Sequence, residues 1–148
     1  MAELTSRAPE GMEEARLMSE TRSGWTDDEL ERIGRADELE ISSRRPDGTE
    51  RPFVTIWAVR LGDELYIRSA HGPGNPWFRR AVRAGTGRVR SGGVDRTVAF
   101  TRIDPAEAAT HEARDEAYHA KYDRYPAQYV SPVVGPASYQ ATLRIDAL

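Results

Sequence analysis

Apolar and polar positions alternate over several short stretches of the chain, and Gly- or Pro-containing turns separate these stretches. Alternation of this kind, with β-branched and aromatic residues, predicts β-strands. The predicted strands cover residues 38–43, 53–61, 64–69, 87–90, 96–103 and 138–145. The turns that predict hairpins between neighbouring strands are Arg45-Pro46-Asp47-Gly48, Gly62-Asp63 and Ser91-Gly92-Gly93.

Three other segments have the spacing of helices. Thr26 is followed by three acids, which predicts a helix N-terminus, and the apolar face of that helix ends near Gly34. Residues 76–84 predict a short amphipathic helix that Gly85 stops. Residues 105–124 predict the longest helix, with alanines close to one stripe and acids concentrated early.

Together these elements predict an α+β fold that is mainly β. Six strands joined by hairpins, with a short helix after the third and a long helix before the last, are closed most economically as an antiparallel split β-barrel. A helix-capped open sheet is the alternative. We expect one domain over residues 24–148, preceded by a flexible acidic leader over residues 1–23 that has few large apolar side chains.

Composition excludes several classes of protein. The chain has 148 residues and no cysteine, which excludes disulfides and thiol catalysis. No apolar run approaches eighteen residues, so no membrane span is expected, and the acidic N-terminus lacks the apolar core of a signal peptide. The simplest expected location is the cytoplasm.

The net charge of −3 conceals an uneven distribution. Residues 1–40 carry twelve acids against five arginines, whereas residues 41–100 carry eleven arginines against five acids. This basic block is short and the rest of the chain is acidic, which argues against nucleic acid as a partner. Lys121 is the only lysine, beside twenty arginines. A bias towards GC-rich codons explains the many arginines. It does not explain why a lysine is kept at position 121, which makes Lys121 a residue of interest.

The segment from Leu65 to Gly93 predicts a site for an anion. Arg68 closes a predicted strand, Gly72 and Gly74 form a loop, and Asn75-Pro76 begins a helix whose first turn carries arginines. Helix N-termini and guanidinium groups both bind phosphate or carboxylate. The candidates are Arg68, Arg79 and Arg80. Alternatively, these arginines form surface ion pairs with Asp63, Glu64 or the acidic long helix.

Tyr118, Lys121, Tyr122 and Tyr125 form a second cluster on the long helix. They could line a pocket in which Tyr118 or Tyr122 donates a proton to a reduced product. The alternative is that they pack the helix onto the barrel with their polar tips in water.

His111, Asp115 and His119 repeat at intervals of four residues along one face of the predicted long helix. One metal ion cannot readily be reached by both histidines across two turns, and no further ligand is apparent in the sequence. We therefore predict no metal site and interpret these residues as a solvated polar face. His71, in the Gly/Pro loop, is either a pocket residue or an ordinary loop residue.

The order of these motifs resembles the flavin-binding split β-barrel superfamily, which has the pyridoxamine-phosphate-oxidase-like fold. The chain is similar to its deazaflavin-dependent nitroreductase branch, and more similar to a related family of small bacterial proteins. The motifs that carry the resemblance are the Trp25 start, the RRPDG turn, the WAV and YIRS strand pair, the WFR helix, YHAKY and the TLR ending.

The resemblance implies a homodimer with FMN or a deazaflavin coenzyme in a groove at the subunit interface. It implies that Arg45 and Arg51, which flank the first hairpin turn, face the coenzyme phosphate. It also places residues at the end of the third strand, in the loop and at the start of the following helix beside the coenzyme. The residues so implied are Arg68, Ser69, Gly72, Trp77, Phe78 and Arg80, and Lys121 is a further candidate.

Two positions depart from the nitroreductase pattern. Asp47 stands where that branch has a serine, which brings a carboxylate close to the expected phosphate, and Arg80 replaces an asparagine. The leading hypothesis is an FMN- or deazaflavin-dependent oxidoreductase that reduces a small organic substrate by hydride transfer. The departures favour the alternative, a cofactor-free split barrel that acts as a small-molecule-binding or structural dimer.

Overall fold

A single antiparallel sheet organises the part of the chain that the computed structural model describes, residues 23–148. The leader predicted for residues 1–23 therefore lies outside the described residues except for Ser23. The sheet has the strand order β2-β1-β5-β6-β7-β4-β3. Its strands are β1 (Leu39–Ser43), β2 (Val54–Ile56), β3 (Ala58–Leu61), β4 (Glu64–Arg68), β5 (Thr86–Ser91), β6 (Val94–Arg102) and β7 (Thr142–Ala147).

Seven strands form this sheet within residues 23–148, and the prediction of six requires correction. The stretch predicted as one strand, 53–61, is divided at Trp57 into β2 and β3. β2 pairs with β1, whereas β3 pairs with β4. Because β2 and β3 are the two edges of the sheet yet follow each other in the chain, this segment joins one edge to the other. The sheet is therefore a nearly closed barrel, and the mainly β class with helices is confirmed.

The predicted hairpins are present in the sheet. β1 pairs with β2, β3 with β4 across Gly62-Asp63, and β5 with β6 across residues 91–93. The final strand starts at Thr142 and not at Ser138, because residues 136–139 form a helical turn. Three short helical segments between the long helix and this strand are absent from the prediction.

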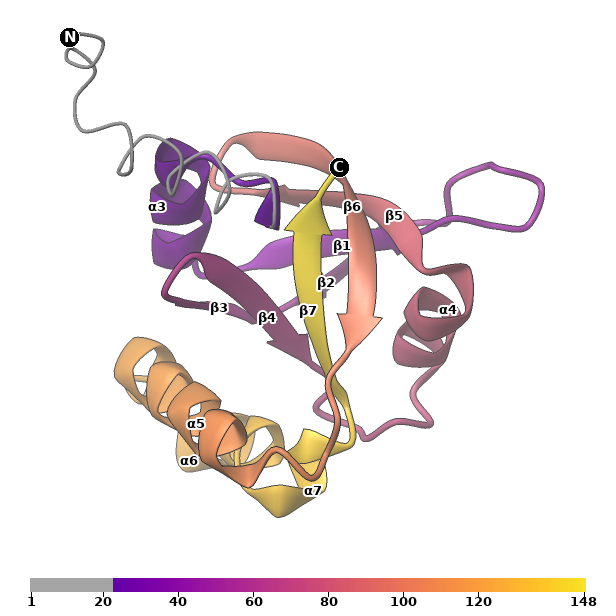
Figure 1. Cartoon of the computed structure of the whole chain (residues 1–148). Helices are drawn as coiled ribbons and strands as arrows, with labels where there is room; N and C mark the ends of the chain where they lie inside the picture. Colours follow the sequence, from indigo (N-terminus) through magenta and orange to yellow (C-terminus); the bar gives the residue numbers. More distant parts are fainter. Residues whose placement is uncertain (1–22) are drawn as a thin grey trace, which may run out of the picture.

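Helices cover the outside and one open end of the sheet (Figure 1). α3 is capped by Thr26, whose hydroxyl accepts a hydrogen bond from the Glu29 N–H while the Glu29 carboxylate accepts one from the Thr26 N–H. None of the described helices is long and apolar enough to cross a membrane. The helical segments are α3 (Asp27–Arg35), α4 (Pro76–Ala84), α5 (Ala108–Tyr122), α6 (Ala127–Val130), η1 (Ser131–Val133) and α7 (Pro136–Tyr139).

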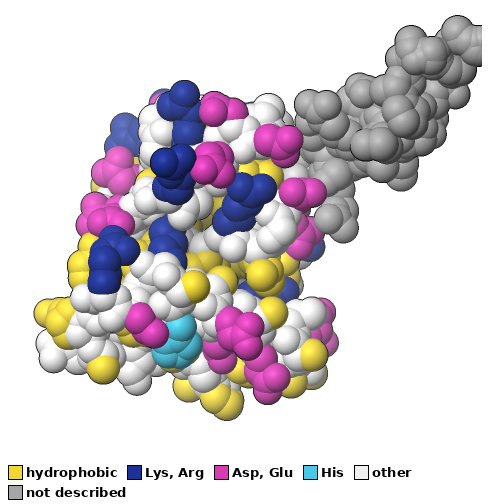
Figure 2. All heavy atoms as spheres, turned by 90° about the vertical axis from the view of Figure 1, so that its left-hand side faces the viewer, with side chains coloured by type: hydrophobic (Ala, Val, Ile, Leu, Met, Phe, Trp, Pro, Cys, Tyr) yellow, Lys and Arg dark blue, Asp and Glu magenta, His cyan; other side chains and the backbone are white. Residues whose placement is uncertain are grey.

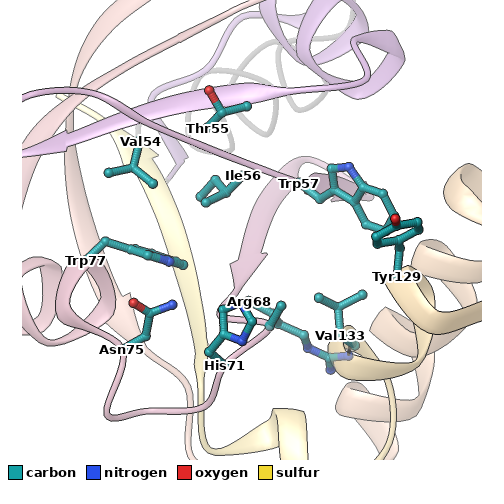
Figure 3. A pocket seen from close by; sticks show the side chains of 11 residues that line it. Val54, Thr55, Ile56, Trp57, Arg68, His71, Asn75, Trp77, Tyr129 and Val133 are labelled. Carbon is teal, nitrogen blue, oxygen red and sulfur yellow. Dashed lines mark hydrogen bonds between the residues drawn. The ribbon is translucent and has the colours of Figure 1, made fainter.

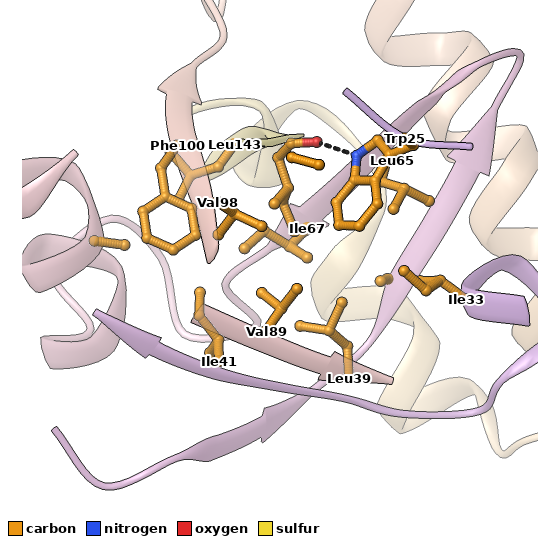
Figure 4. Close-up of a cluster of buried hydrophobic side chains, with 14 of the residues drawn as sticks. Trp25, Ile33, Leu39, Ile41, Leu65, Ile67, Val89, Val98, Phe100 and Leu143 are labelled. Atoms are coloured by element: carbon orange, nitrogen blue, oxygen red, sulfur yellow. Dashed lines mark hydrogen bonds between the residues drawn. The ribbon is translucent and has the colours of Figure 1, made fainter. Parts of the chain in front are cut away.

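Two apolar clusters stabilise this arrangement. The larger one fills the barrel and includes Trp25, which is 1% exposed and donates its indole N–H to the Ile145 carbonyl at 2.9 Å (Figure 4). The smaller cluster lies between α5 and the outer face of β3 and β4, and it contains Tyr118 and Tyr122. The long helix is thus attached to the barrel through its tyrosines, as the alternative interpretation of that cluster expects, but the tips of Tyr118 and Tyr122 are buried and not in water.

Candidate functional site

A cavity of about 500 Å³ opens between β2, the loop after β4, the start of α4 and α6. Its walls are mainly apolar and aromatic, a character typical of sites for small molecules. Trp57 and Trp77 stand on opposite sides of it (Figure 3). The other lining residues are Val54, Thr55, Ile56, Arg68, Ala70, His71, Asn75, Tyr129 and Val133.

Trp57 is a rigid wall of the cavity because Tyr122 supports it from behind. The two rings stack with 3.9 Å between their centroids and 7° between their planes. The Tyr122 hydroxyl donates a hydrogen bond to the Asp37 carbonyl at 2.8 Å and accepts one from the Ala58 N–H. Trp57 lies at the point where the chain leaves β2 and enters β3. Its stacking on Tyr122 therefore holds both the closure of the barrel and one wall of the cavity.

The opposite wall depends on how the loop after β4 leads into α4. Gly72 has a φ of +82°, which residues with a Cβ rarely adopt, and its conformation turns the chain towards the helix. Pro76 occupies the first turn of α4, which places Trp77 at the cavity. Asn75 precedes the helix, but its side chain makes no capping hydrogen bond. Its amide is therefore available to a molecule in the cavity.

A second hollow, of about 350 Å³, lies beside the C-terminal half of α4 and is lined by five arginines. Within residues 23–148, no carboxylate pairs with Arg51, Arg80 or Arg83, and Arg45 donates only to the Thr49 hydroxyl and the Glu50 carbonyl. We call this hollow the arginine groove. Its lining residues are Arg44, Arg45, Pro46, Arg51, Arg80, Arg83, Ala84 and Thr86.

Arg51 shows most clearly that the arginine groove has an excess of positive charge. Its Nε is buried and has no hydrogen-bond partner among the described residues. Burial and the nearby charges of Arg80, Arg45 and Arg83 lower the pKa of Arg51. A bound anion would supply both the missing acceptor and the missing negative charge.

Asp47 offsets only part of the positive charge of the arginine groove, since the pKa of Arg51 is still lowered. Its carboxylate accepts hydrogen bonds from the Thr49 N–H at 3.0 Å and the Thr49 hydroxyl at 2.7 Å. These bonds hold the pKa of Asp47 below its usual range and close the turn between β1 and β2. Asp47, where the nitroreductase branch has a serine, thus stabilises the turn.

The cavity and the arginine groove have no lining residue in common, but they lie along the same two segments of the chain. On one wall, Arg51 precedes Val54 by three residues, a separation of at most about 10 Å in extended chain. On the other, Trp77 and Arg80 are three residues apart on α4 and therefore neighbours on its surface. We call the two hollows together the composite site, which has an aromatic end and a basic end.

Arg68 has a different position from the one that the resemblance implies. Its side chain is fully buried beneath the cavity, and it forms an ion pair with Asp115 of α5 at 2.6 Å. It also donates to the carbonyls of Val133 and His111 and to the Thr142 hydroxyl. Because its N–H donors are occupied inside the protein, Arg68 has a structural role. Of the two sequence interpretations, an ion pair with the long helix fits its contacts, and phosphate binding does not.

The tyrosine cluster is also structural. Tyr118 is completely buried, and its hydroxyl has no hydrogen-bond partner among residues 23–148. Burial raises the pKa of both Tyr118 and Tyr122, which keeps both phenols protonated at neutral pH. Neither residue lines the cavity, so the geometry gives no route for a proton from Tyr118 or Tyr122 to a ligand there.

Lys121, Phe78 and Ser69 likewise lie outside the composite site. Lys121 lines a separate groove between α3, β3 and α5. Phe78 is 1% exposed and belongs to the barrel core, and Ser69 is 1% exposed. Of the residues that the resemblance places at the coenzyme, the site contains Arg45, Arg51, Trp77 and Arg80; Arg68 lines the cavity floor with its guanidinium paired inside the protein, and Gly72 shapes the loop.

The histidines of α5 do not meet at a metal site. His111 is buried beside Arg68, and Asp115 is paired with the same arginine, whereas His119 is exposed and pairs with Asp123 at 2.8 Å. The interpretation as a solvated polar face is therefore wrong for His111 and Asp115. Among the residues that the structure describes, no cluster of three or more His, Cys, Asp or Glu side chains could hold a metal ion.

Sequence reasoning missed several residues of the composite site. Arg83 follows Arg80 by three positions on a helix that was predicted, so its place in the arginine groove could have been inferred from the pattern. Tyr129 and Val133 lie in short helical segments that had no sequence signal. Arg44, Val54, Ile56 and Asn75 depend on the path of β2 and on the loop before α4.

Comparison with known proteins connects this architecture to a bacterial family. The model of the family described as an uncharacterized protein conserved in bacteria, DUF2255, matches residues 29–145. The chain belongs to this family. The match covers most of the chain, including every residue of the composite site. No curated protein matches this DUF2255 chain.

Solved structures share the fold of this DUF2255 protein. A conserved hypothetical protein from Mycobacterium tuberculosis is 12% identical, with a TM-score of 0.55 and coverage of 83% of this chain and 81% of that one. A FAD-binding protein from Mesorhizobium loti is 14% identical, with a TM-score of 0.53 and coverage of 84% and 91%. At these identities the similarity shows a common barrel fold.

Proposed function

We propose that the composite site of this protein binds a flavin or deazaflavin coenzyme. The ring system would lie between Trp57 and Trp77, and the phosphate would lie among Arg45, Arg51 and Arg80. The observation that carries the proposal is the adjacency of an aromatic cavity to arginines that lack carboxylate partners within residues 23–148. A planar ring joined to a phosphate by a short polar chain matches both ends of this site.

The fold and the chemistry of the lining residues support this ligand. The FAD-binding protein from Mesorhizobium loti has the same fold, so a barrel of this kind can accommodate a flavin. Aromatic side chains provide stacking surfaces for planar rings. Arginine offers paired N–H donors to phosphate oxygens. The amide of Asn75 is free to form a hydrogen bond with the edge of the ring.

The activity that we propose is reduction of a small organic molecule, as in the nitroreductase branch. When bound, a coenzyme of this class supplies hydride transfer. The protein's own residues would bind the phosphate, orient the ring and exclude water from the reacting face. His71 and Tyr129 line the same cavity and carry groups that could give a proton to the reduced product.

We also propose that two copies of the chain form a homodimer that covers this site. Val54 on the edge strand β2 is 37% exposed and Tyr129 is 55% exposed, and both lie at the cavity. Exposed apolar and aromatic side chains around a site are typical of an interface. Sedimentation analysis of the purified protein tests this, since a monomer at all concentrations would contradict it.

The proposed reductase activity can be tested under anaerobic conditions. The protein would be mixed with the chemically reduced coenzyme and a nitroaromatic or quinone acceptor, and oxidation of the coenzyme would be followed by absorbance. We expect turnover above the rate without protein, and loss of that turnover in Arg51→Met. If the coenzyme binds but neither class of acceptor is reduced, the reductase hypothesis is contradicted, and the protein only binds the coenzyme.

A cofactor-free small-molecule-binding dimer is the second candidate. The departure from the nitroreductase pattern at Arg80 is the sequence feature that favours it, whereas Asp47 is held within its turn and does not distinguish the two functions. In that case the composite site would hold another small molecule with an apolar part and an anionic group. Failure of FMN and of the deazaflavin coenzyme to bind would favour this function over the first.

A further inference from the structure

Lys121 lies in a groove of its own, separate from the composite site. This groove has a volume of about 370 Å³ and runs between α3, β3 and α5. Figure 2 shows the face of the molecule that carries α3, with basic and acidic side chains interspersed across it. We call this third hollow the lysine groove. Its lining includes Leu30, Gly34, Val59, Ala117 and Ala120 together with Lys121.

The backbone holds the Lys121 amine in a defined position. Its Nζ donates to the Ala58 carbonyl at 2.7 Å and contacts the Ile33 carbonyl at 3.4 Å. An amine that gives two N–H groups to these carbonyls has one tetrahedral position left. That position carries a third N–H in the ammonium form and a lone pair in the neutral form.

The surroundings of Lys121 make its amine easier to deprotonate than that of a free lysine. Burial lowers the pKa of Lys121 to about 8, and the nearby Arg124 lowers it further while Asp37 opposes the shift. The charged side chains at the lysine groove are Glu31 and Arg35 on α3 and Arg60 on β3. At pH 8 about half of the molecules carry an uncharged amine, which is the nucleophilic form.

Small residues leave the lysine groove open on both sides of the amine. Ala117 and Ala120 of α5 lie on one side, and Gly34 lies at the end of α3. A Cβ at Gly34 would lie 3.4 Å from the Arg60 Cβ, so a larger residue there would narrow the groove. The groove can therefore admit a small molecule beside Lys121.

Arg60 is a cation at the lysine groove that forms two long ion pairs. Its guanidinium lies 3.7 Å from a carboxylate oxygen of Glu31 and 3.9 Å from one of Asp63. Both distances exceed those of hydrogen bonds, and within residues 23–148 only its Nε forms one, to the Gly62 carbonyl at 2.8 Å. Its terminal N–H groups are consequently available to a ligand carboxylate.

We propose that Lys121 is a nucleophilic lysine that binds small anionic aldehydes as an imine. The neutral amine attacks the aldehyde carbon, a C–N bond forms, and a proton passes from nitrogen to oxygen to give a carbinolamine. Loss of water then gives the C=N bond, so one amine and one aldehyde yield one imine and one water. An arginine at position 121 could keep the positive charge but could not perform this reaction.

Reductive trapping on the full chain tests the proposal, because the α-amino group is the only other primary amine. The probes are glyoxylate, which is an anionic aldehyde, and propanal, which is neutral, each with cyanoborohydride at pH 8. Peptide mapping by mass spectrometry identifies the modified amine. We expect glyoxylate to label Lys121 about 10- to 100-fold faster in the folded protein than in urea, and faster than propanal does.

Three results would overturn the proposal. They are labelling of the α-amino group without Lys121, equal labelling of Lys121 in the folded and unfolded chain, and equal rates for the two aldehydes. Lys121→Arg should lose the internal adduct and keep the one at the α-amino group. If that variant fails to fold, Arg60→Met serves instead, and it should slow glyoxylate labelling but leave propanal labelling unchanged.

Discussion

Arg68 and Asp115 form a 2.6 Å ion pair that joins the end of β4 to the middle of α5. The arginine side chain is fully buried and the aspartate side chain is 18% exposed. The Tyr139 hydroxyl donates to the other Asp115 oxygen at 2.8 Å, and Arg68 lies 5.3 Å from the Tyr139 ring. This pair therefore connects the barrel with the helical segments that form one side of the cavity.

Breaking this ion pair should destabilise the protein. Arg68→Met leaves the Asp115 carboxylate partly buried without its cation, and loss of one partner of a buried pair costs about 3–5 kcal/mol. Chemical denaturation followed by circular dichroism measures the free energy of unfolding. Arg32→Ala is the control, since Arg32 forms an exposed pair with Asp28 and should change stability by less than about 1 kcal/mol. Equal effects of the two substitutions would contradict the structural role of Arg68.

Replacing Arg51, unlike replacing Arg68, should not destabilise the protein. Among the described residues the Arg51 Nε has no hydrogen-bond partner, and neighbouring arginines repel its charge, so Arg51→Met should leave the melting temperature unchanged or raise it. Sulfate should stabilise the wild-type protein more than this variant, because the anion offsets the repulsion. Melting curves with and without sulfate, compared with sodium chloride at equal ionic strength, provide the measurement. A clear loss of stability in Arg51→Met would show that its charge has a partner.

Trp77 should contribute to ligand binding more than to stability. It is only half-buried at the cavity, whereas Trp57 also stacks on Tyr122. We expect Trp77→Leu to weaken coenzyme binding about tenfold, the effect of about 1.4 kcal/mol of lost stacking, with a small change in unfolding free energy. Calorimetric titration beside a denaturation curve separates the two effects. If Trp77→Leu binds the coenzyme with unchanged affinity, the coenzyme ring does not stack on Trp77.

The stability contributed by Lys121 should depend on pH. Its pKa is about 8 in the folded chain and 10.5 as a free side chain. Between these values the unfolded chain binds more protons, so the free energy of unfolding should rise with pH. Relative to Lys121→Met, we expect a gain of about 1–2 kcal/mol from pH 8 to pH 10. A constant difference between the two proteins would mean that folding leaves this pKa unchanged.

The strand pattern predicted most of the barrel because alternation, turns and caps are local features. The hairpins and α3 follow from signals within a few residues, such as the reciprocal bonds of Thr26 and Glu29. The break at Trp57 could not be predicted, since it depends on Tyr122, which is 65 residues away in the chain. Periodicity describes an extended segment but does not show which strand each half will pair with.

The candidate site shows the same division between local and distant information. Arg45, Arg51 and Arg80 lie together in the arginine groove, although their role with a phosphate stays a prediction. In the sequence, Arg68 looks like any other arginine at the end of a strand. Its partner Asp115 lies far away in the chain, and no local pattern links the two residues. Burial, which distinguishes Arg68 from Arg51, is a property of the packed structure and not of the local pattern.

Titration of the purified protein with FMN and with the oxidised deazaflavin coenzyme tests the central claim most directly. Binding would be followed by calorimetry and by fluorescence, for the wild type, Arg51→Met and the Arg32→Ala control. We predict saturable binding of at least one coenzyme, about 10- to 100-fold weaker in Arg51→Met, as expected for loss of a charged hydrogen bond, and unchanged in Arg32→Ala. Absence of saturable binding to both coenzymes, or equal affinity in Arg51→Met, would contradict the account.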